Sequence, residues 1–332
     1  MHTPRHYAAA MRRWFRRATA LTDLRGVFEV VYGRSPSDHE LSVMETNLGP
    51  DNRHDSLKAF RAVVNGIDHQ HHPTPFAIRF GADDVDYVQV EGVEVAVDTA
   101  DVSVSEPIIG GYYEPHLVPF VIDFLKPGMT FVDVGANVGF YSIIAAKAVG
   151  PEGRVLSFEP NSENCRLVML SARRNRVENI SLFPFALGNR PGHALFHTHL
   201  GSNGGLVWDE ADALLDPTAV VVPIARLDDL VSGAVDLIKI DVEGAEALVV
   251  EGATELIRTH RPTVVSEFSL EMLRRVSSVE GLDYLRFWAD EGYSLNRLDR
   301  ESRQLVPIVD PVVYLDGYDR LRLEDLVFLP LT

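Results

Sequence analysis

Four acidic residues each stand at the end of a short apolar run, and these residues are the first indication of chemistry in the chain. They are Asp133 in "TFVD", Glu159 in "VLSFE", Asp241 in "LIKID" and Glu267 in "TVVSE". Apolar runs of this kind predict strands that are buried on both faces. Because the carboxyl ends of parallel strands meet at one edge of a sheet, the four carboxylates should lie there together. Each carboxylate costs desolvation free energy unless it meets a cation or donors, so we expect a positively charged ligand.

The stretch "TFVDVGANVGFYS" predicts a strand, a tight turn at Gly135 and a helix that begins beside Gly139. In the dinucleotide-binding fingerprint, two further glycines admit a pyrophosphate and allow close packing of helix and strand. Asn137 and Phe140 stand at those positions here, so a pyrophosphate fits poorly. A helix N-terminus still attracts an anion, and a lone carboxylate would satisfy it. S-adenosylmethionine offers that carboxylate, two positive centres and no phosphate, and we expect it as the cofactor.

The residues after the later strands have separate expected roles. Glu159 ends its strand where folds of this class place an acid over the ribose hydroxyls. Lys239 shares a strand face with Asp241, and a lysine in a central strand is rare unless it is paired. Two readings of Lys239 stay open, namely a structural ion pair with an acid at the sheet edge or a direct role near the methyl acceptor. Glu243, in the following loop, is a candidate for ligand contact, and Glu246 is expected to complement a helix dipole.

The elements that must position these residues follow from the periodicity of the chain. Strand and helix patterns alternate from about residue 117, which predicts an α/β fold with a mostly parallel sheet and helices on both faces. Residues 1–75 predict a small N-terminal helical domain, residues 76–115 a β-hairpin lead-in around Gly92, and residues 116–332 the main domain. The segments "YSLNRL", "LVPIV" and "DLVFLP" can supply late strands.

Composition narrows the setting of the protein. The net charge of −17 over 332 residues disfavours nucleic acid as a partner. The single cysteine, Cys165, fits a reducing compartment and reads as a small core residue. No apolar run reaches the roughly 20 residues of a membrane helix, and no signal peptide is recognised, so we expect a cytoplasmic protein. A basic N-terminal helix with Arg12, Arg13, Arg16 and Arg17 leaves peripheral membrane contact open as an alternative.

The segments "FVDVGANVGFYS", "SFEP", "ALG", "LDDL" and "DLIKIDVEGAE" together resemble the FkbM family of S-adenosylmethionine-dependent methyltransferases. The resemblance covers roughly residues 110–268 and implies a Rossmann-like class I fold, with a seven-stranded sheet that ends in an antiparallel hairpin. It implies that Asp133, Gly135, Asn137 and Gly139 hold the methionine part, that Glu159 holds the ribose, and that residues around Phe185, Ala186 and Leu187 flank the adenine. Phe140 and Pro160 belong to the same cofactor-binding set. Glu114 in "GYYEPH" is carried over as a further cofactor contact.

The resemblance also implies an acceptor and a reaction. The region "HTHLGSNGG" matches a variable acceptor loop, in which His197, His199, Ser202 and Asn203 are candidates for substrate binding. We expect O-methylation of a sugar, glycolipid or polyketide hydroxyl by in-line transfer. Asp241 is the leading base or orienting group, with Lys239, Glu243 and Glu267 beside it. Methyl acceptor identity and oligomeric state are left open.

Three alternatives accompany this reading. Asp241, Glu243 and Glu267 could bind Mg²⁺, which prefers oxygen ligands and would acidify the acceptor hydroxyl, although we do not expect a metal. A non-catalytic module that binds S-adenosylmethionine and a nicotinamide-dependent oxidoreductase are the other two. The oxidoreductase is opposed by Asn137 and Phe140, which replace the glycines that a pyrophosphate needs.

Overall fold

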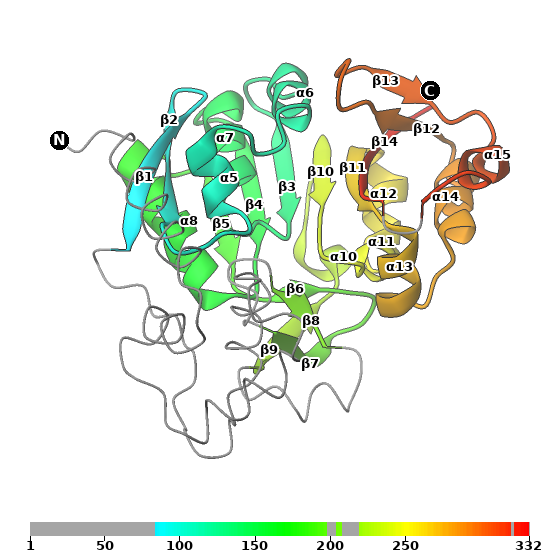
Figure 1. The fold of residues 1–332 in the computed structure, drawn as a ribbon. Coiled ribbons are helices and arrows are strands. Elements are labelled where there is room, and N and C mark those ends of the chain that lie inside the picture. The colour runs from blue at the N-terminus through cyan, green and yellow to red at the C-terminus, as the bar shows by residue number, and fades with distance from the viewer. Residues whose placement is uncertain (1–83, 198–203, 208–218, 320–321, 332) are drawn as a thin grey trace, which may run out of the picture. The chain divides into compact units, whose positions relative to one another are not determined.

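The computed structural model describes residues 84–197, 204–207, 219–319 and 322–331. Its centre is an eight-stranded sheet (Figure 1). In spatial order the strands are β13 (Leu305–Pro307), β12 (Tyr293–Leu298), β14 (Glu324–Pro330), β11 (Thr263–Phe268), β10 (Leu237–Ile240), β3 (Thr130–Val134), β4 (Arg154–Phe158) and β5 (Ile180–Phe183). The strands from β11 to β5 pair in parallel, whereas β14 pairs antiparallel with both β11 and β12. This is the expected class I arrangement.

The late strands differ from the expectation in number. The segments "YSLNRL" and "DLVFLP" form β12 and β14, which complete a seven-stranded sheet with an antiparallel end. The short strand β13 then pairs antiparallel with the outer edge of β12 and adds an eighth strand. Its three residues continue a meander, because the chain turns back at Asp299, whose N–H donates to the carbonyl of Gln304.

Helices cover both faces of this sheet. One group packs with β2 (Val93–Asp98) on the first face and comprises α5 (Ser105–Gly110), α6 (Leu117–Phe124), α7 (Phe140–Val149) and α8 (Ser162–Asn175). The other group lies on the second face and comprises α10 (Leu227–Leu230), α11 (Glu246–Glu251), α12 (Thr254–His260), α13 (Leu270–Val276), α14 (Gly281–Asp290) and α15 (Pro311–Leu315). Strand β10 contributes side chains to both cores, because Leu237 belongs to the first core and Ile238 and Ile240 belong to the second.

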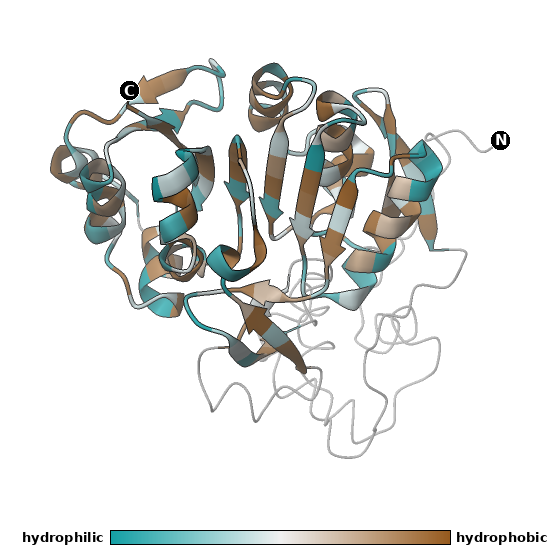
Figure 2. Ribbon diagram, turned by 180° about the vertical axis from the view of Figure 1, so that it is seen from behind, coloured by the Kyte–Doolittle hydropathy of each residue, from teal (hydrophilic) through white to brown (hydrophobic). Residues whose placement is uncertain are grey.

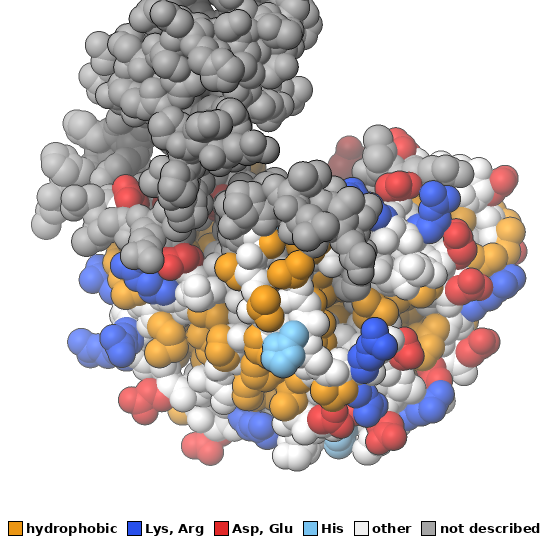
Figure 3. Space-filling view, turned by 90° about the horizontal axis from the view of Figure 1, so that it is seen from below, with side chains coloured by type: hydrophobic (Ala, Val, Ile, Leu, Met, Phe, Trp, Pro, Cys, Tyr) orange, Lys and Arg blue, Asp and Glu red, His pale blue; other side chains and the backbone are white. Residues whose placement is uncertain are grey.

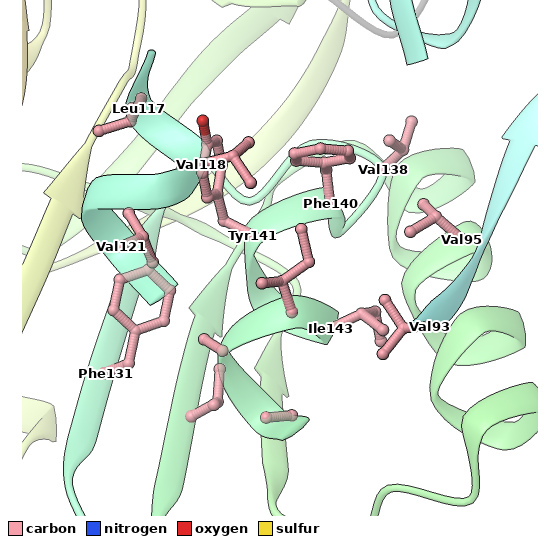
Figure 4. Close-up of a cluster of buried hydrophobic side chains, with 14 of the residues drawn as sticks. Val93, Val95, Leu117, Val118, Val121, Phe131, Val138, Phe140, Tyr141 and Ile143 are labelled. Carbon is pink, nitrogen blue, oxygen red and sulfur yellow. The ribbon is translucent and has the colours of Figure 1, made fainter. Parts of the chain in front are cut away.

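The two cores explain the continuous apolar runs of the sequence. Each central strand sends successive side chains to opposite faces, and both faces are covered by helices (Figure 2). Figure 4 shows the first core, in which Val93 of the hairpin lies beside Ile143 of α7. Val118 of α6 lies beside Tyr141, and Val121 lies against Phe131 of β3. Burial of such side chains stabilises a fold by about 1.5–3 kcal/mol each.

The predicted hairpin around Gly92 is present. Strand β1 (Val85–Val90) pairs antiparallel with β2 (Val93–Asp98), and Glu91 and Gly92 at the turn have positive φ. Side chains of α8 hold the hairpin against the domain, because Ser171 Oγ accepts from the backbone N–H of Ala96 at 2.8 Å and Arg174 pairs with Glu94. The hairpin is therefore packed on the helical layer of the main domain.

A second, four-stranded sheet stands at the carboxyl edge of the main sheet (Figure 1). Its order is β6 (Ala186–Leu187), β9 (Val220–Ala225), β7 (Gly192–His197) and β8 (Gly205–Leu206). The segment "ISLFPFAL" has the apolar pattern of a single strand, but it divides between the two sheets. Phe183 ends β5, Pro184 follows, and Ala186 begins β6. Proline cannot donate to a strand ladder, which accounts for the break.

Two expected features fall on residues outside the described ranges. The N-terminal helical domain of residues 1–75 lies outside the described residues, and so does the basic helix with its four arginines. Among the helices of the described ranges, none combines the length and the apolar content that crossing a bilayer requires.

Candidate active site

A pocket opens at the carboxyl ends of β3, β4 and β10, with an empty volume of about 820 Å³ that includes open solvent at its mouth. Figure 3 views this side of the molecule, where hydrophobic side chains gather near the centre and charged ones around them. Its lining consists of Val104, Tyr113, residues 133–138, Phe140, Tyr141, residues 158–160, residues 185–187, Phe196, residues 204–206, Lys239, residues 241–243 and Ala245. The volume suits a ligand of nucleoside size.

The turn after β3 is shaped by close contact with other segments of the same chain. Gly135 has a φ of +80°, and a Cβ added to it would lie 1.8 Å from the carbonyl oxygen of Asp241. Gly139, at a φ of +85°, begins α7, and its Cβ would lie 2.8 Å from Val168 Cγ2 of α8. Both glycines are therefore required by close packing of protein on protein.

The N–H groups of this turn are already used within the protein. Those of Gly135 and Ala136 both donate to the carbonyl of Phe158 at 3.0 Å, and that of Gly139 donates to the carbonyl of Ala136 at 2.8 Å. The N–H of Asn137 donates to Glu159 Oε2 at 2.8 Å, and that of Val138 to Asn137 Oδ1. The turn thus presents no row of N–H donors for an anion, which differs from our expectation that it would bind the ligand carboxylate.

Glu159 lies at the end of β4 and is only 4% exposed. Besides Asn137, the backbone N–H of Asn161 donates to its Oε1 at 2.8 Å, and Asn164 donates at 3.4 Å. Burial raises the pKa of Glu159 to about 7, although these hydrogen bonds oppose the shift. A carboxylate has about four acceptor positions, so with these three donors Glu159 can still accept from one ligand hydroxyl group.

Lys239 and Asp241 form a buried ion pair at the end of β10. The distance from Lys239 Nζ to Asp241 Oδ2 is 2.8 Å, and Lys239 is 4% exposed. Burial opposes the charged lysine, but the surrounding Asp241, Glu114 and Asp133 raise the pKa of Lys239 well above its ordinary value. Both readings of Lys239 meet here, because it is paired with an acid and also lines the pocket.

Asp133 stands opposite Lys239 in the pairing of β3 with β10. Ser142 of α7 donates its hydroxyl to Asp133 Oδ2 at 2.5 Å, and its Oγ lies 2.7 Å from Ser157 Oγ. Burial raises the pKa of Asp133, whereas Lys239 and Ser142 lower it. The carboxylate is thereby tied to the first turn of α7.

Aromatic rings form two walls of the pocket. Phe158 and Phe185, with ring centroids 6.0 Å apart, lie on the side of Glu159. On the other side, Phe140 is edge-to-face with Tyr113 at 5.0 Å and with Tyr141 at 5.2 Å. Burial raises the pKa of both tyrosines well above the ordinary value, so they stay neutral at physiological pH. The pocket therefore has apolar side walls and charged groups at the sheet edge.

The loop after β10 is held in place by hydrogen bonds to the side chain of Glu246. Its buried Oε1 accepts from the N–H groups of Val242 at 3.1 Å and Gly244 at 3.0 Å. Burial raises the pKa of Glu246 to about 7, although these backbone hydrogen bonds oppose the shift. Glu246 therefore shapes the loop that carries Glu243, a role beyond the helix-dipole effect expected from its position. Glu243 has a φ of +54° and lines the pocket.

The other acids at the sheet edge lie beside the pocket. Glu267 of β11 stands opposite Asp325 of β14 in the strand pairing. Burial, followed by the charges of Asp241 and Glu243, raises the pKa of Glu267 well above its ordinary value. Asp325 Oδ2 is 2.6 Å from His116 Nε2, which ties the loop before α6 to β14. The four strand-end acids thus share one edge, as expected, but Glu267 is not part of the pocket lining.

The structure places the other predicted residues as follows. The lining of the pocket includes the predicted residues Asp133, Gly135, Asn137, Phe140, Glu159, Pro160, Ala186, Lys239, Asp241 and Glu243. Glu114, Gly139, Glu267 and His197 are described residues that do not line it. His199, Ser202 and Asn203 lie outside the described residues. Gly139 acts through the packing of α7 on α8.

The described ranges contain no group of three or more His, Cys, Asp or Glu side chains placed to hold a metal ion. Asp241, Glu243 and Glu267, all of which are described, therefore do not form a ready-made ligand set for Mg²⁺. Cys165 is buried, and burial raises the pKa of its thiol to about 12, which fits the expected structural role.

Sequence reasoning missed several residues of the lining. Tyr113 and Tyr141 were not proposed, although "GYYEPH" and "GFYS" placed both beside predicted site residues. Phe196 and Leu206 come from the second sheet, at paired positions of β7 and β8. The alternation in "GHALFH" could have suggested a strand there, but only the fold brings that strand to the pocket.

The chain resembles several proteins of known identity. Residues 133–295 match the family model of the Methyltransferase FkbM domain. The 2-O-methyltransferase NoeI of Sinorhizobium fredii is 27% identical over 164 residues, which are 43% of this chain and 65% of that protein. A protein-L-isoaspartate O-methyltransferase of Triticum aestivum is 30% identical over 149 residues, 42% of this chain and 60% of the relative. The chain thus spans less than two thirds of either relative.

Among solved structures, the methyltransferase FkbM from Methylobacillus flagellatus aligns with a TM-score of 0.39 and 17% identity, over 69% of this chain and 55% of that one. The family match covers the turn at Gly135, Glu159 and the segment from Lys239 to Glu246, the elements that build the pocket. By that match, residues 133–295 form a methyltransferase FkbM domain.

Proposed function

We propose that this protein is an S-adenosylmethionine-dependent O-methyltransferase that acts on a hydroxyl of a sugar, a glycolipid or a polyketide-type natural product. The observation that carries the proposal is the pocket itself, in which a buried Glu159 faces a turn without donors for phosphate and the Lys239–Asp241 pair lies at the end of β10. The 2-O-methyltransferase NoeI supports transfer to oxygen as the chemistry.

The residues present fit this cofactor better than a dinucleotide. The five N–H groups from Gly135 to Gly139 are all bonded within the protein, so a pyrophosphate would find no donors there. Glu159 keeps acceptor capacity for one ribose hydroxyl, and Phe158 and Phe185 offer ring faces beside it for the adenine. The carboxylates Asp133 and Asp241 supply negative charge for a cationic ligand.

When bound, S-adenosylmethionine supplies an electrophilic methyl group on a sulfonium cation. The chain then has to hold the acceptor oxygen in line and take its proton. Positioning of this kind can lower a barrier by about 7–11 kcal/mol. Lys239 holds Asp241 Oδ2 at 2.8 Å, which leaves the other carboxylate oxygen to orient the acceptor hydroxyl or accept its proton. General base catalysis adds about 10²–10⁴-fold. Glu243 lines the same part of the pocket and can bind the acceptor.

Product analysis tests the proposal. The full-length protein is incubated with isotopically methyl-labelled cofactor and a panel of glycans, glycolipids and polyketides, and products are identified by mass spectrometry. Label on an acceptor oxygen is the expected result, and Asp241→Asn should abolish most of it. Label found only on nitrogen would overturn O-methylation. Cofactor binding without transfer to any acceptor would favour the non-catalytic module instead.

The metal alternative has its own test. The same reaction is run after treatment with EDTA and again after Mg²⁺ is restored. Because Asp241, Glu243 and Glu267 form no ready ligand group, we expect the rate to be unchanged by the chelator. Loss of activity that Mg²⁺ restores would replace Asp241 as base by a metal-bound hydroxyl.

A further inference from the structure

Glu114 lies behind the pocket wall, in the loop between α5 and α6. Its φ of +39° is unusual for a residue with a side chain, and its carbonyl accepts from the N–H groups of Leu117 and Val118 at 3.0 and 3.2 Å. Strained backbone held by defined hydrogen bonds is frequent at functional sites. The half-buried Glu114 side chain is therefore fixed, although it does not line the pocket.

A chain of contacts connects Glu114 to the pocket. The hydroxyl of Tyr141 donates to Glu114 Oε2 at 2.5 Å. The ring of Tyr141, which lies between α6 and α7 (Figure 4), is 5.0 Å from Lys239 Nζ. Lys239 in turn bonds Asp241 at 2.8 Å. Tyr141, Lys239 and Asp241 line the pocket, so Glu114 stands directly behind groups that a ligand would meet.

This end of the pocket has more acids than bases. Glu114 interacts electrostatically with Lys239 of β10, with Asp241 after β10 and with Asp325 of β14. It also accepts the hydrogen bond from Tyr141 of α7. The charge of Asp133 of β3 also interacts with that of Lys239. Asp325 has its own partners in His116 and, at 3.9 Å, Arg300. One lysine thus balances three carboxylates, those of Asp133, Asp241 and Glu114, and the excess is negative.

We infer that Glu114 is a positioning residue that acts through Tyr141 and Lys239 to make the pocket hold cationic S-adenosylmethionine more tightly than the neutral product S-adenosylhomocysteine. The inference rests on the proposed function. The two ligands share their adenosine and amino-acid parts and differ by one methyl group and one positive charge. Negative charge behind the pocket therefore attracts the first ligand and gives the second no comparable attraction, so new substrate displaces the product more readily after each transfer.

The ratio of the two affinities isolates this effect. Glu159 lies by the part of the pocket that suits the ribose, which both ligands carry, so its ionisation should alter both affinities alike. Burial raises the pKa of Glu114 to about 7, with Lys239 opposing the shift. The carboxyl therefore gains its charge between about pH 6 and pH 8, and the preference for the cationic ligand should increase over that range.

The experiment measures dissociation constants of both ligands by calorimetry, at pH 6 and pH 8, for the wild-type protein and three variants. Glu114→Gln removes the charge and keeps an oxygen that can accept from Tyr141. Tyr141→Phe removes the hydroxyl and keeps the ring. Glu152→Gln removes the same charge from an exposed position before β4, at the opposite edge of the sheet, and is the matched control.

We expect the wild-type protein to prefer S-adenosylmethionine, and more so at pH 8. Glu114→Gln should reduce the affinity ratio at pH 8 on the order of threefold to tenfold and remove its pH dependence. Glu152→Gln should leave the ratio unchanged, and Tyr141→Phe should reduce it in part. Equal affinities in the wild-type protein, or a ratio that Glu114→Gln does not change, would overturn the inference and leave the proposed function standing. A wild-type protein that binds neither ligand would overturn both.

Discussion

Asp241 makes several contacts at the pocket, more than a purely structural side chain would need. It is paired with Lys239, it lines the pocket, and its backbone carbonyl presses on Gly135. Asp241→Asn keeps the shape of the side chain and removes its negative charge and basicity. We expect turnover to fall by about 10²-fold or more, with a smaller change in cofactor affinity. Single-turnover rates and calorimetry check this, and a loss confined to cofactor affinity would contradict a role in the transfer step.

Gly135 tests whether the turn after β3 is set by close packing. Its Cβ position is blocked by the carbonyl oxygen of Asp241 at 1.8 Å, and its φ is +80°. We expect Gly135→Ala to lower the free energy of unfolding by more than about 2 kcal/mol and to weaken cofactor binding. Gly128→Ala is a matched control, because Gly128 has a φ of +89° with nothing within 4 Å of its Cβ position. Equal losses in the two variants would show that backbone strain, and not the contact, is responsible.

Glu159 is the residue through which the ribose is expected to bind. Glu159→Ala removes the acceptor and should weaken binding of S-adenosylmethionine by about 1.5–3 kcal/mol. S-adenosylhomocysteine has the same ribose, so we expect its affinity to fall by a similar amount. Calorimetry with both ligands measures this, and unchanged affinities would exclude Glu159 from the ribose site.

The sequence predicted the strand-end residues well, because each depends only on local pattern and on parallel pairing. Asp133, Glu159 and Asp241 all reach the pocket for this reason. Glu114 was expected to contact the cofactor, but it lies behind Tyr141, which no periodicity in "GYYEPH" could indicate. Phe196 and Leu206 could not be predicted either, because the antiparallel pairing of β7 with β8 brings them to the site.

At the scale of elements, the loop from Val242 to Ala245 depends on one buried side chain of α11. Glu246→Ala would leave the N–H groups of Val242 and Gly244 without their acceptor. We expect the free energy of unfolding to fall by about 2–3 kcal/mol, while Glu246→Gln, which keeps an acceptor oxygen, should cost much less. Denaturant titration of both variants measures the difference. Similar losses in the two would mean that the charge of Glu246, and not its hydrogen bonds, holds the loop.

The element boundaries also show where local pattern is insufficient. Strands β3, β4, β10 and β11 of the main sheet follow their apolar periodicity, and the alternation correctly gave a mostly parallel sheet. The division of "ISLFPFAL" between two sheets depends on Pro184 and on the pairing of β6 with β9, which is far away in sequence. The segment "LVPIV", expected as a late strand, supplies the eighth one, which pairs with the free edge of β12 through Leu305–Pro307.

At the scale of the whole molecule, buried acids should make stability depend on pH. Burial raises the pKa of Glu114, Glu159 and Glu246 to about 7, above the ordinary value of 4.5. The folded protein therefore holds more protons than the unfolded chain between these values, and its stability decreases as pH rises through that window. We expect the free energy of unfolding without ligand to be larger at pH 5 than at pH 8. Urea titration measures this free energy at both pH values. A larger value at pH 8 would contradict the raised pKa values that burial gives these acids.

Ligand binding should reverse part of this loss. A cationic ligand favours the ionised carboxylates, and a ligand that binds only the folded state stabilises it by mass action. At pH 8 we therefore expect S-adenosylmethionine to raise the melting temperature, and to raise it less in Glu159→Ala. An identical rise in that variant would place the ligand away from the pocket.

The most direct test of the central claim is a calorimetric comparison of S-adenosylmethionine with NAD⁺ on the wild-type protein. The turn from Gly135 to Gly139 has no N–H group left for a pyrophosphate, and the strand ends offer carboxylates to a cation. The account predicts saturable one-site binding of S-adenosylmethionine and no measurable binding of NAD⁺. Binding of NAD⁺ with no binding of S-adenosylmethionine would contradict it.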